Sequence, residues 1–507
     1  MDGILVYIFL FMISLLLALK LLLSHGKNLP PSPFFPLPLI GHLHLLKHPI
    51  HQTLHNLSKK YGHVFSLWFG SRLVVVVSSP SAVCECFTKN DIVLANRPFL
   101  NTGKHLTYNF TVLAVAPYGE LWRSLRRIST CEIFSTSRLN LFSGIRQDEV
   151  KRLLCKLCNG NLVEELLIPT VVEVEPMLLD FTSNIVMRMV AGKRYFGDDV
   201  LHEGQAGRFS DVVKRVMMCA GATNPGDFIP LWNWIDPTGL QKKIMKVGEE
   251  VDAIFQGLID EIRNQQEGGN TMIHHLLHLQ TTQPEYFSDQ IIKGLIHVIL
   301  LAGIDTTAVT LEWALSHLLN NPEVIKKARL EIECCTGQKR LVNEEDLSSL
   351  SYLQGIILET LRLTPAAPLL VPHCASEDCQ IEGYDIPRDT IIFVNAWAIH
   401  RDPNLWEDVT TFKPERHENA VELSDSYKLL PFGLGRRACP GVGMAQRVVG
   451  LTLASLIQCF DWERMNGSLV DMTEGQGITM PKAQPLVAKC KPRPIMRALV
   501  SEVIHPI

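Results

Sequence analysis

The sequence predicts a mainly α-helical protein with small β-sheets, folded as one large globular domain behind a single N-terminal transmembrane helix. Apolar residues recur with helical spacing over most of the 507 residues, whereas β-like runs such as 72–78 and 390–395 are short. No internal repeat or convincing linker divides residues 39–507. The first apolar stretch is also long enough to cross a bilayer. We therefore treat residues 39–507 as one domain.

Residues 3–23 form the predicted transmembrane anchor. As a helix, this apolar run covers a hydrocarbon layer of ~30 Å. A cleaved signal peptide is the alternative, but the basic leading region is missing and no small-residue cleavage site follows. Lys20 and Lys27 follow the span, whereas only Asp2 precedes it. The distribution of positive charge therefore predicts that the main domain lies in the cytosol.

A proline-rich hinge is predicted at 29–38, where the prolines disfavour a helix and stiffen the chain. The domain that follows has no global charge bias, because 48 basic and 52 acidic residues give a net charge of −4 for the whole chain. A protein that binds nucleic acid through its phosphates needs a basic surface. The composition therefore argues against a nucleic-acid partner.

A long helix through the middle of the domain is predicted from Ser288, a good helix cap, through 291–319. His297 and Asp305 interrupt its apolar centre, which excludes a second membrane span. Within it, residues 302–307 read Ala-Gly-Ile-Asp-Thr-Thr. The polar side chains could be satisfied by the local backbone, or the helix could lie against a flat ligand and pass protons. On this segment alone both interpretations remain open.

Glu359 and Arg362 lie three residues apart on one face of a predicted helix with apolar flanks. Such a pair is usually solvated on a surface, but the apolar flanks favour burial here. Arg416 follows downstream and could supply a second arginine to the same carboxylate. The pattern therefore indicates an internal ion-pair network.

Trp122 and Arg126 lie four residues apart, so that a helix places an indole donor and a cation on the same face. This arrangement suits an anionic oxygen, although a basic surface helix has the same pattern. His373 is a further donor for which a structural role is equally plausible.

The most informative stretch is the loop Phe-Gly-Leu-Gly-Arg-Arg-Ala-Cys-Pro-Gly at 432–441. Arg436, Arg437 and the start of a following helix could each stabilise a Cys439 thiolate. Three roles compete for this cysteine: nucleophile, part of a phosphate cradle, or axial iron ligand. A nucleophile lacks a base in this loop, and the glycines fit no nucleotide-binding pattern. An iron ligand needs only one sulfur, tight turns and nearby donors.

These residues closely resemble those of a plant microsomal cytochrome P450. The loop matches F-x-x-G-x-R-x-C-x-G, and the central helix, the E-x-x-R pair and the W-x-x-x-R pair match further family motifs in the right order. The resemblance extends from the anchor to the C-terminus and implies the cytochrome P450 fold. One position departs from it, because His417 follows Arg416 where the family usually has phenylalanine or another apolar residue. That departure puts the local packing in doubt.

The resemblance implies roles for the motif residues. Cys439 is expected to be the proximal ligand of haem b, with Phe432 packed near its sulfur. Thr306 and Asp305 are expected to deliver protons during dioxygen activation. The expected contacts of the haem propionates are Trp122, Arg126, His373 and Arg437. The expected internal network is Glu359, Arg362 and Arg416.

The resemblance also implies an oxidoreductase that uses O2 and NADPH-derived electrons to hydroxylate a hydrophobic plant metabolite, phenylpropanoid-like, isoflavonoid-like or terpenoid. The subgroup includes isoflavone hydroxylases, indole-glucosinolate hydroxylases and lignan methylenedioxy-bridge enzymes. Bridge formation, or rearrangement of a hydroperoxide without a reductase, is the alternative, and the presence of Thr306 favours hydroxylation. The residues expected to face substrate are Leu106, Phe110, Leu113, Ala302, Leu369, Leu370 and Ile478.

The implied location is the endoplasmic reticulum membrane, with a single pass, a lumenal N-terminus and a cytosolic catalytic domain. The implied partners are NADPH–cytochrome P450 reductase, the lipid bilayer and a hydrophobic small molecule. The reductase is expected to dock near Cys439, where several cations could lie. These cations are Arg123, Arg127, Lys428 and Arg436.

Overall fold

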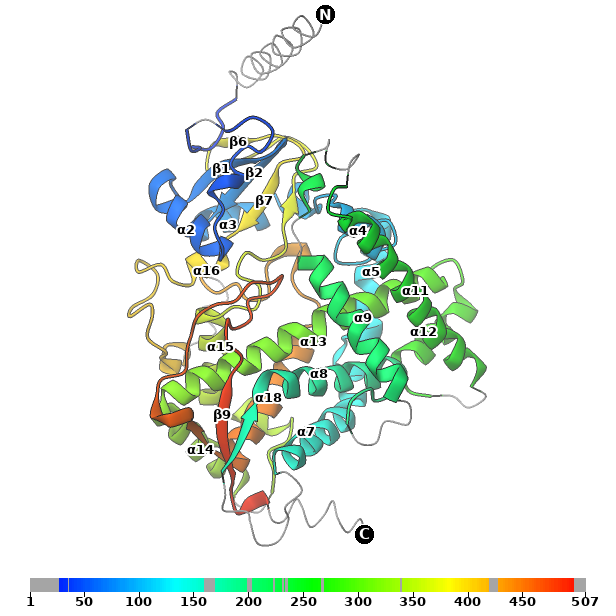
Figure 1. The fold of residues 1–507 in the computed structure, drawn as a ribbon, viewed down its shortest axis with the longest axis vertical. Helices are drawn as coiled ribbons and strands as arrows, with labels where there is room; N and C mark the ends of the chain where they lie inside the picture. Colours follow the sequence, from blue (N-terminus) through cyan, green and yellow to red (C-terminus); the bar gives the residue numbers. More distant parts are fainter. Residues whose placement is uncertain are drawn as a thin grey trace, which may run out of the picture.

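The computed structural model describes residues 27–34, 36–158, 169–197, 203–221, 224–229, 232, 236–265, 269–337, 340–418 and 427–496. The anchor expected at 3–23 lies outside these residues. Figure 1 shows strands β1, β2, β6 and β7 at one end of the molecule, and the rest is mostly helical, with strand β9 beside α14 and α18. The predicted class, mainly helical with small sheets, is confirmed.

The helices account for most of the described chain. Their bounds are α2 (Ile50–Tyr61), α3 (Pro80–Phe87), α4 (Asn101–Leu106), α5 (Glu120–Ile128), α6 (Thr136–Leu141), α7 (Ser143–Leu157), α8 (Val174–Ala191), α9 (Glu203–Gly221), α11 (Leu240–Asn264), α12 (Met272–Thr282), α13 (Asp289–Asn320), α14 (Pro322–Thr336), α15 (Ser351–Leu363), α16 (Ala396–Ile399) and α18 (Val442–Cys459). Short turns that bear on the site are η2 (Val93–Ala95), the π-helical η3 (Ser129–Ile133), η6 (Pro414–His417) and η7 (Gly435–Arg437).

Three small sheets are present in the described chain. The largest has the strand order β1-β2-β7-β4, and the others are β3-β9-β8 and β5-β6. The strands are β1 (Val64–Phe69), β2 (Arg72–Val77), β3 (Thr170–Glu173), β4 (His373–Cys374), β5 (Cys379–Ile381), β6 (Tyr384–Ile386), β7 (Ile391–Val394), β8 (Phe460–Arg464) and β9 (Val487–Pro492). The two runs predicted as strands, 72–78 and 390–395, are β2 and β7, which pair in parallel with Val74 opposite Ile391. The four valines of β2 are buried, as expected of a central strand.

The proline-rich segment lies against the large sheet. The hydroxyl of Ser66 on β1 donates to the carbonyl oxygen of Pro30 at 2.8 Å, and the Ser66 N–H donates to that of Pro31 at 2.8 Å. Proline has no N–H to give to a sheet, but its carbonyl can still accept. The first part of the predicted hinge is therefore attached to the domain by its carbonyl groups.

Helix α13 is the central element, packed against α8, α11, α15 and α18 (Figure 1). It begins as predicted, because the Ser288 side chain accepts a hydrogen bond from the N–H of Ile291 at 3.4 Å. Every residue in 307–319 is buried. Among the described residues, α13 and α18 are apolar and long enough to cross a membrane, but both are core helices, with 67% and 72% of their most apolar windows buried.

Candidate functional site

Two glycines and one hydrogen bond shape the loop that carries Cys439. Gly433 and Gly435 have φ angles of +66° and +65°, which other residues rarely adopt. The N–H of Cys439 donates to the carbonyl oxygen of Phe432 at 2.9 Å, which closes the loop. Helix α18 begins three residues after the cysteine, at Val442. The sulfur is therefore held on a tight loop just before a core helix.

Asp91 fixes the middle of this loop from another part of the chain. Its carboxylate accepts from the backbone N–H of Arg436 at 3.0 Å and pairs with the Arg436 side chain at 3.0 Å. A Cβ atom on Gly435 would lie only 2.3 Å from the Asp91 Oδ1 atom. Glycine is thus required at 435 both by its φ angle and by the close approach of Asp91.

The cation that lowers the pKa of Cys439 is Arg126, and not Arg436 or Arg437 of the loop itself. Burial holds the pKa of the Cys439 thiol above its usual value, and a hydrogen bond from the Gly441 N–H and the charge of Arg126 partly offset this. Arg126 also donates to the carbonyl oxygen of Ala438 at 2.6 Å. Of the loop arginines, Arg436 pairs with Asp91 and Arg437 turns away to other carbonyl groups. The predicted start of the following helix does contribute, through the Gly441 N–H, whereas the two loop arginines do not.

Arg97, Arg126 and Arg437 form a cationic cluster near the cysteine loop. Within the described chain, Arg437 donates to the carbonyl oxygens of Ala95, Leu113 and Ala116. Arg97 donates to those of Ala114, Val371 and Pro372. Burial, and then the charge of Arg437, lower the pKa of Arg97 to about 9. Burial, and then Arg126, lower that of Arg437 to about 10.

Such a cluster favours an anionic ligand, because buried like charges that meet only backbone carbonyls are costly. The Arg437 guanidinium lies 4.6 Å from the centre of the Trp122 ring, and the buried Nε1 atom of Trp122 has no hydrogen-bond partner in the described chain. An orphaned indole N–H beside clustered arginines suits the two carboxylates of a haem. Arg97 was missed by the sequence analysis, because burial of a single arginine leaves no local signal.

His373 lies beside the cationic cluster in β4. Its Nδ1 atom is 2.7 Å from the carbonyl oxygen of Leu94, so Nδ1 carries the proton and donates. Burial, and then the charge of Arg97, hold the pKa of His373 well below its usual range. The ring is therefore neutral, and its Nε2 atom is an acceptor. The contact with a propionate stays a prediction, and in this protonation state Nε2 cannot donate.

The motif in α13 presents one small and two polar side chains. Ala302 is exposed, whereas the helix is buried from Thr307 onward. The Thr306 hydroxyl donates to the carbonyl oxygen of Ala302 at 2.5 Å. The Asp305 carboxylate instead accepts from the Thr479 hydroxyl at 2.5 Å. Burial raises the pKa of Asp305, and the Thr479 hydrogen bond partly offsets this.

The predicted network around Glu359 is present and has an additional member. Arg362 donates to both carboxylate oxygens of Glu359 at 2.8 Å, and Arg416 donates to Oε1 at 2.9 Å. His417 is buried and its Nε2 atom lies 2.8 Å from Glu359 Oε2. The departure at His417 therefore places a hydrogen-bonding ring against the carboxylate. Burial alone would raise the pKa of Glu359, but the bonds from Arg362 and His417 lower it to about 2.

The residues expected to face substrate lie in separate places. Leu106 and Leu113 belong to the main helical core, whereas Leu369 and Leu370 pack against the two smaller clusters around the large sheet. Phe110 makes an edge contact with Phe99, with ring centres 4.8 Å apart. Ile478 is 56% exposed. Their joint role as a substrate pocket stays a prediction.

These features define a haem-dependent monooxygenase. They are the Cys439 loop before a core helix, the cationic cluster beside it, and the exposed Ala302 with the polar Asp305 and Thr306 in the central helix. The chain belongs to the cytochrome P450 family, whose family model matches residues 30–488. Members of this family use haem b, with O2 and NADPH-derived electrons. The predicted class of enzyme and the predicted cofactor are thus confirmed.

Three plant proteins are similar over nearly the whole chain. Cytochrome P450 81Q32 of Catharanthus roseus is 56% identical and covers 99% of both chains. Isoflavone 3'-hydroxylase of Medicago truncatula is 53% identical, over 96% of this chain and 97% of that protein. The (+)-piperitol/(+)-sesamin synthase of Sesamum radiatum is 50% identical, over 94% and 93%. These relatives confirm the predicted plant subgroup.

A solved structure of the same fold is a zebra fish cytochrome P450 with progesterone. It aligns with a TM-score of 0.73 at 25% identity and covers 88% of this chain and 100% of that one. The predicted single-domain cytochrome P450 architecture agrees with this likeness, and the bounds 39–507 stay a prediction.

Proposed function

We propose that this monooxygenase hydroxylates a hydrophobic plant metabolite of phenylpropanoid or isoflavonoid type, or a terpenoid, with Cys439 as the iron ligand. The observation that carries the proposal is that the cationic cluster lies beside the Cys439 loop. One thiol faces outward from a loop held by Asp91, and three arginines gather beside it. When bound there, haem would supply the activation of dioxygen and the cleavage of a C–H bond.

The residues of the cationic cluster would bind and orient the cofactor. Arg97, Arg126 and Arg437 would neutralise the two propionates, and the free Nε1–H of Trp122 would donate to one of them. Phe432 would cover the loop beside the sulfur. The Gly441 N–H and the Arg126 charge would favour the anionic form of Cys439.

Thr306 and Asp305 would move protons toward the reacting oxygen. The Thr306 hydroxyl can break its bond to the Ala302 carbonyl at small cost and donate instead to a ligand beside Ala302. Asp305 has a raised pKa, so it can take up and release a proton closer to neutral pH than an ordinary aspartate.

Relatives named as an isoflavone hydroxylase and a sesamin synthase support an aromatic plant substrate.

Electrons would come from NADPH–cytochrome P450 reductase, which would dock on the face near the cysteine loop. Arg123 and Arg127 are exposed there, and Arg436 is exposed on the loop itself. The guanidinium groups of Arg123 and Arg436 lie 5.8 and 5.6 Å from the Tyr118 ring centre, so they share one surface. Such a cationic face suits an acidic partner.

We further propose that residues 3–23 anchor the enzyme in the endoplasmic reticulum membrane, with the catalytic domain in the cytosol. The apolar run and the lysines that follow it support this orientation. Fractionation of tagged protein, with protease added to sealed microsomes, tests it. Digestion of the catalytic domain from outside is expected, and full protection would contradict the orientation.

The test of the reaction is turnover by microsomes that contain this chain and a plant reductase, supplied with NADPH and a panel of isoflavones, lignans and terpenoids. We expect hydroxylated products in which one oxygen atom derives from 18O2, and none without NADPH or reductase. A methylenedioxy product alone would contradict hydroxylation. Conversion of a hydroperoxide without NADPH would indicate the rearranging class instead.

A further inference from the structure

A hairpin near the C-terminus, residues 473–483, contacts the central helix α13 beside the motif residue Asp305. Its two arms pair at Glu474 and Lys482, and backbone hydrogen bonds on either side of this bridge close the loop. We call this segment the C-terminal hairpin. Its shape is fixed by its own backbone.

The C-terminal hairpin is attached to the rest of the domain at both its base and its tip. At the base, the Glu474 carboxylate accepts from Gln52 of α2 and from the indole N–H of Trp397 of α16, each at 2.7 Å. Near the tip, the carbonyl oxygen of buried Met480 accepts from the indole N–H of Trp313 of α13 at 2.8 Å. The residue that precedes Met480 is therefore held beside α13.

That residue is Thr479, whose hydroxyl donates to the Asp305 carboxylate at 2.5 Å. No other side chain in the described part of the chain donates to Asp305. The charged groups around it are the carboxylates of Glu175 on α8 and Glu312 on α13, together with Lys482 of the hairpin. The charge of Asp305 adds to burial in raising the pKa of Glu175, whereas Lys482 acts on Glu312. Thr479 is thus the group that favours the ionised form of Asp305.

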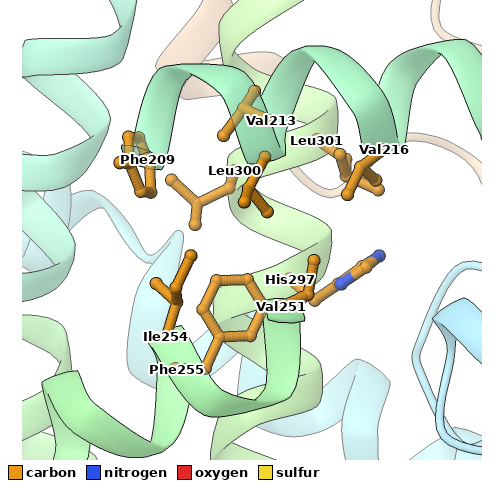
Figure 2. Close-up of a pocket in the computed structure, with 10 residues that line it drawn as sticks. Phe209, Val213, Val216, Val251, Ile254, Phe255, His297, Leu300 and Leu301 are labelled. Carbon is orange, nitrogen blue, oxygen red and sulfur yellow. The ribbon is translucent and has the colours of Figure 1, made fainter. Parts of the chain in front are cut away.

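The side of α13 that faces α9 and α11 is apolar one turn before Asp305. Leu300 and Leu301 line a small hollow there with side chains of α9 and α11 (Figure 2). Its lining is apolar apart from His297, whose ring nitrogens point away from the hollow and have no hydrogen-bond partner among the described residues. The hydroxyl that Asp305 receives therefore comes from the hairpin and not from these helices.

We propose that Thr479 is a positioning residue for proton delivery, which holds the Asp305 carboxylate by its hydroxyl and so sets how Asp305 serves Thr306. This inference rests on the proposed role of Asp305 and Thr306 in the reaction. The Thr306 hydroxyl donates to the carbonyl oxygen of Ala302, so the hairpin, and not the neighbour in the motif, fixes the carboxylate. Loss of the Thr479 hydroxyl would free the carboxylate and raise its pKa further, because the bond favours the ionised form.

The bond itself is tested by unfolding the ferric holoenzyme in denaturant at pH 5 and at pH 8. The folded pKa of Asp305 lies above its ordinary value, so its ionisation costs stability as the pH rises through that pKa. Thr479→Val keeps the shape of the side chain and removes the donor. The substitution should raise the unfolding constant about tenfold more at pH 8 than at pH 5. In the Asp305→Asn background its cost should be the same at both pH values.

The role in proton delivery is tested by the pH dependence of hydrogen peroxide released per NADPH consumed, with purified plant reductase and no added substrate. In Thr479→Val the midpoint should move up by about one pH unit, and in Thr479→Ser it should stay at the wild-type value. Thr473→Val is the matched control, because the exposed Thr473 hydroxyl donates to Asp471 at 2.6 Å at the base of the same hairpin. It should leave the midpoint unchanged.

An unchanged midpoint in Thr479→Val, or an equal shift in Thr473→Val, would overturn the inference. A cost of Thr479→Val that is the same at pH 5 and pH 8 in the wild-type background would overturn it as well. Asp305→Asn separates this failure from a failure of the proposed function. A wild-type pH profile in Asp305→Asn would contradict the role of Asp305 and the inference with it. A flat profile there, with no shift in Thr479→Val, would remove only the positioning role.

Discussion

The N–H of Cys439 donates to the carbonyl oxygen of Phe432 at 2.9 Å, and this bond closes a loop that two glycines allow to turn. The first prediction follows from the difference between these glycines. At Gly433 an added Cβ atom meets nothing within 4 Å, so Gly433→Ala brings only the strain of a positive φ, about 1 kcal/mol. At Gly435 it also meets Asp91 at 2.3 Å. Gly435→Ala should therefore lower both the melting temperature and the bound haem per chain more than Gly433→Ala.

Equal effects of the two substitutions would show that Asp91 does not hold the loop. The double variant Asp91→Ala, Gly435→Ala provides a check, because removal of the carboxylate removes the clash. The double variant should lose the clash but also the two bonds of Asp91 to Arg436, so Gly435→Ala should cost less in the Asp91→Ala background than in the wild type.

Arg97 is expected to bind the cofactor although no sequence motif marks it. Replacement by methionine removes a buried cation from the cluster and should speed haem transfer to apomyoglobin about tenfold or more, since a hydrogen bond to a charged group contributes about 1.5–3 kcal/mol. Arg123→Met is the matched control at an exposed position of α5. Identical transfer rates in the two variants would remove Arg97 from the haem site.

The Glu359 network should stabilise the fold strongly against the loss of one partner. Glu359→Gln leaves the buried Arg362 and the partly buried Arg416 short of an anion and should lower the free energy of unfolding by about 3–5 kcal/mol. His417→Phe removes one donor and restores the residue usual at this position, so it should cost less. Chemical denaturation at pH 7 measures both, and a larger loss in His417→Phe would contradict this ranking.

The same network predicts how stability depends on pH. Glu359 has a folded pKa of about 2, below the ordinary value of 4.5, so the folded state favours its ionised form. Its contribution is complete above pH 4.5 and is lost as the pH falls through the folded pKa. The wild type should therefore lose more unfolding free energy than Glu359→Gln between pH 5 and pH 2.5. Parallel curves for the two proteins would contradict this assignment.

Thr306 and Thr310 offer a matched pair for testing proton delivery. Each hydroxyl donates to the carbonyl oxygen four residues earlier, so both substitutions remove the same helix contact. Thr306 lies one helical turn after the exposed Ala302, whereas Thr310 is buried. In Thr306→Ala, product formed per NADPH consumed should fall severalfold, whereas Thr310→Ala should stay near the wild type. Full coupling in Thr306→Ala would remove this residue from the mechanism.

The sequence predicted those features that depend on local pattern. Helix α13, the strands β2 and β7 and the Glu359–Arg362 pair follow from periodicity and spacing within short segments. The parallel pairing of β2 with β7 was not predicted. What it missed depends on distant segments that meet. Arg126, rather than Arg436, is the cation near Cys439, because Asp91 draws Arg436 away.

Arg97 and His297 show the same limit of sequence analysis. Arg97 lies in the connection between η2 and α4, and His297 lies in an apolar helix. In either place the same local sequence is compatible with a side chain that is exposed, paired or buried without a partner. Burial by other elements decides between these outcomes. Only the fold brings Arg97 beside Arg437 and places His297 among the walls supplied by α9 and α11.

The most direct test of the central claim, that the Cys439 sulfur is the axial ligand, is the carbon monoxide difference spectrum of the dithionite-reduced protein. We predict the red-shifted band that only thiolate-ligated haem gives, in wild type and in Thr473→Val, and its loss in Cys439→Ala. A wild-type spectrum typical of histidine ligation, or a band that persists in Cys439→Ala, would contradict the account.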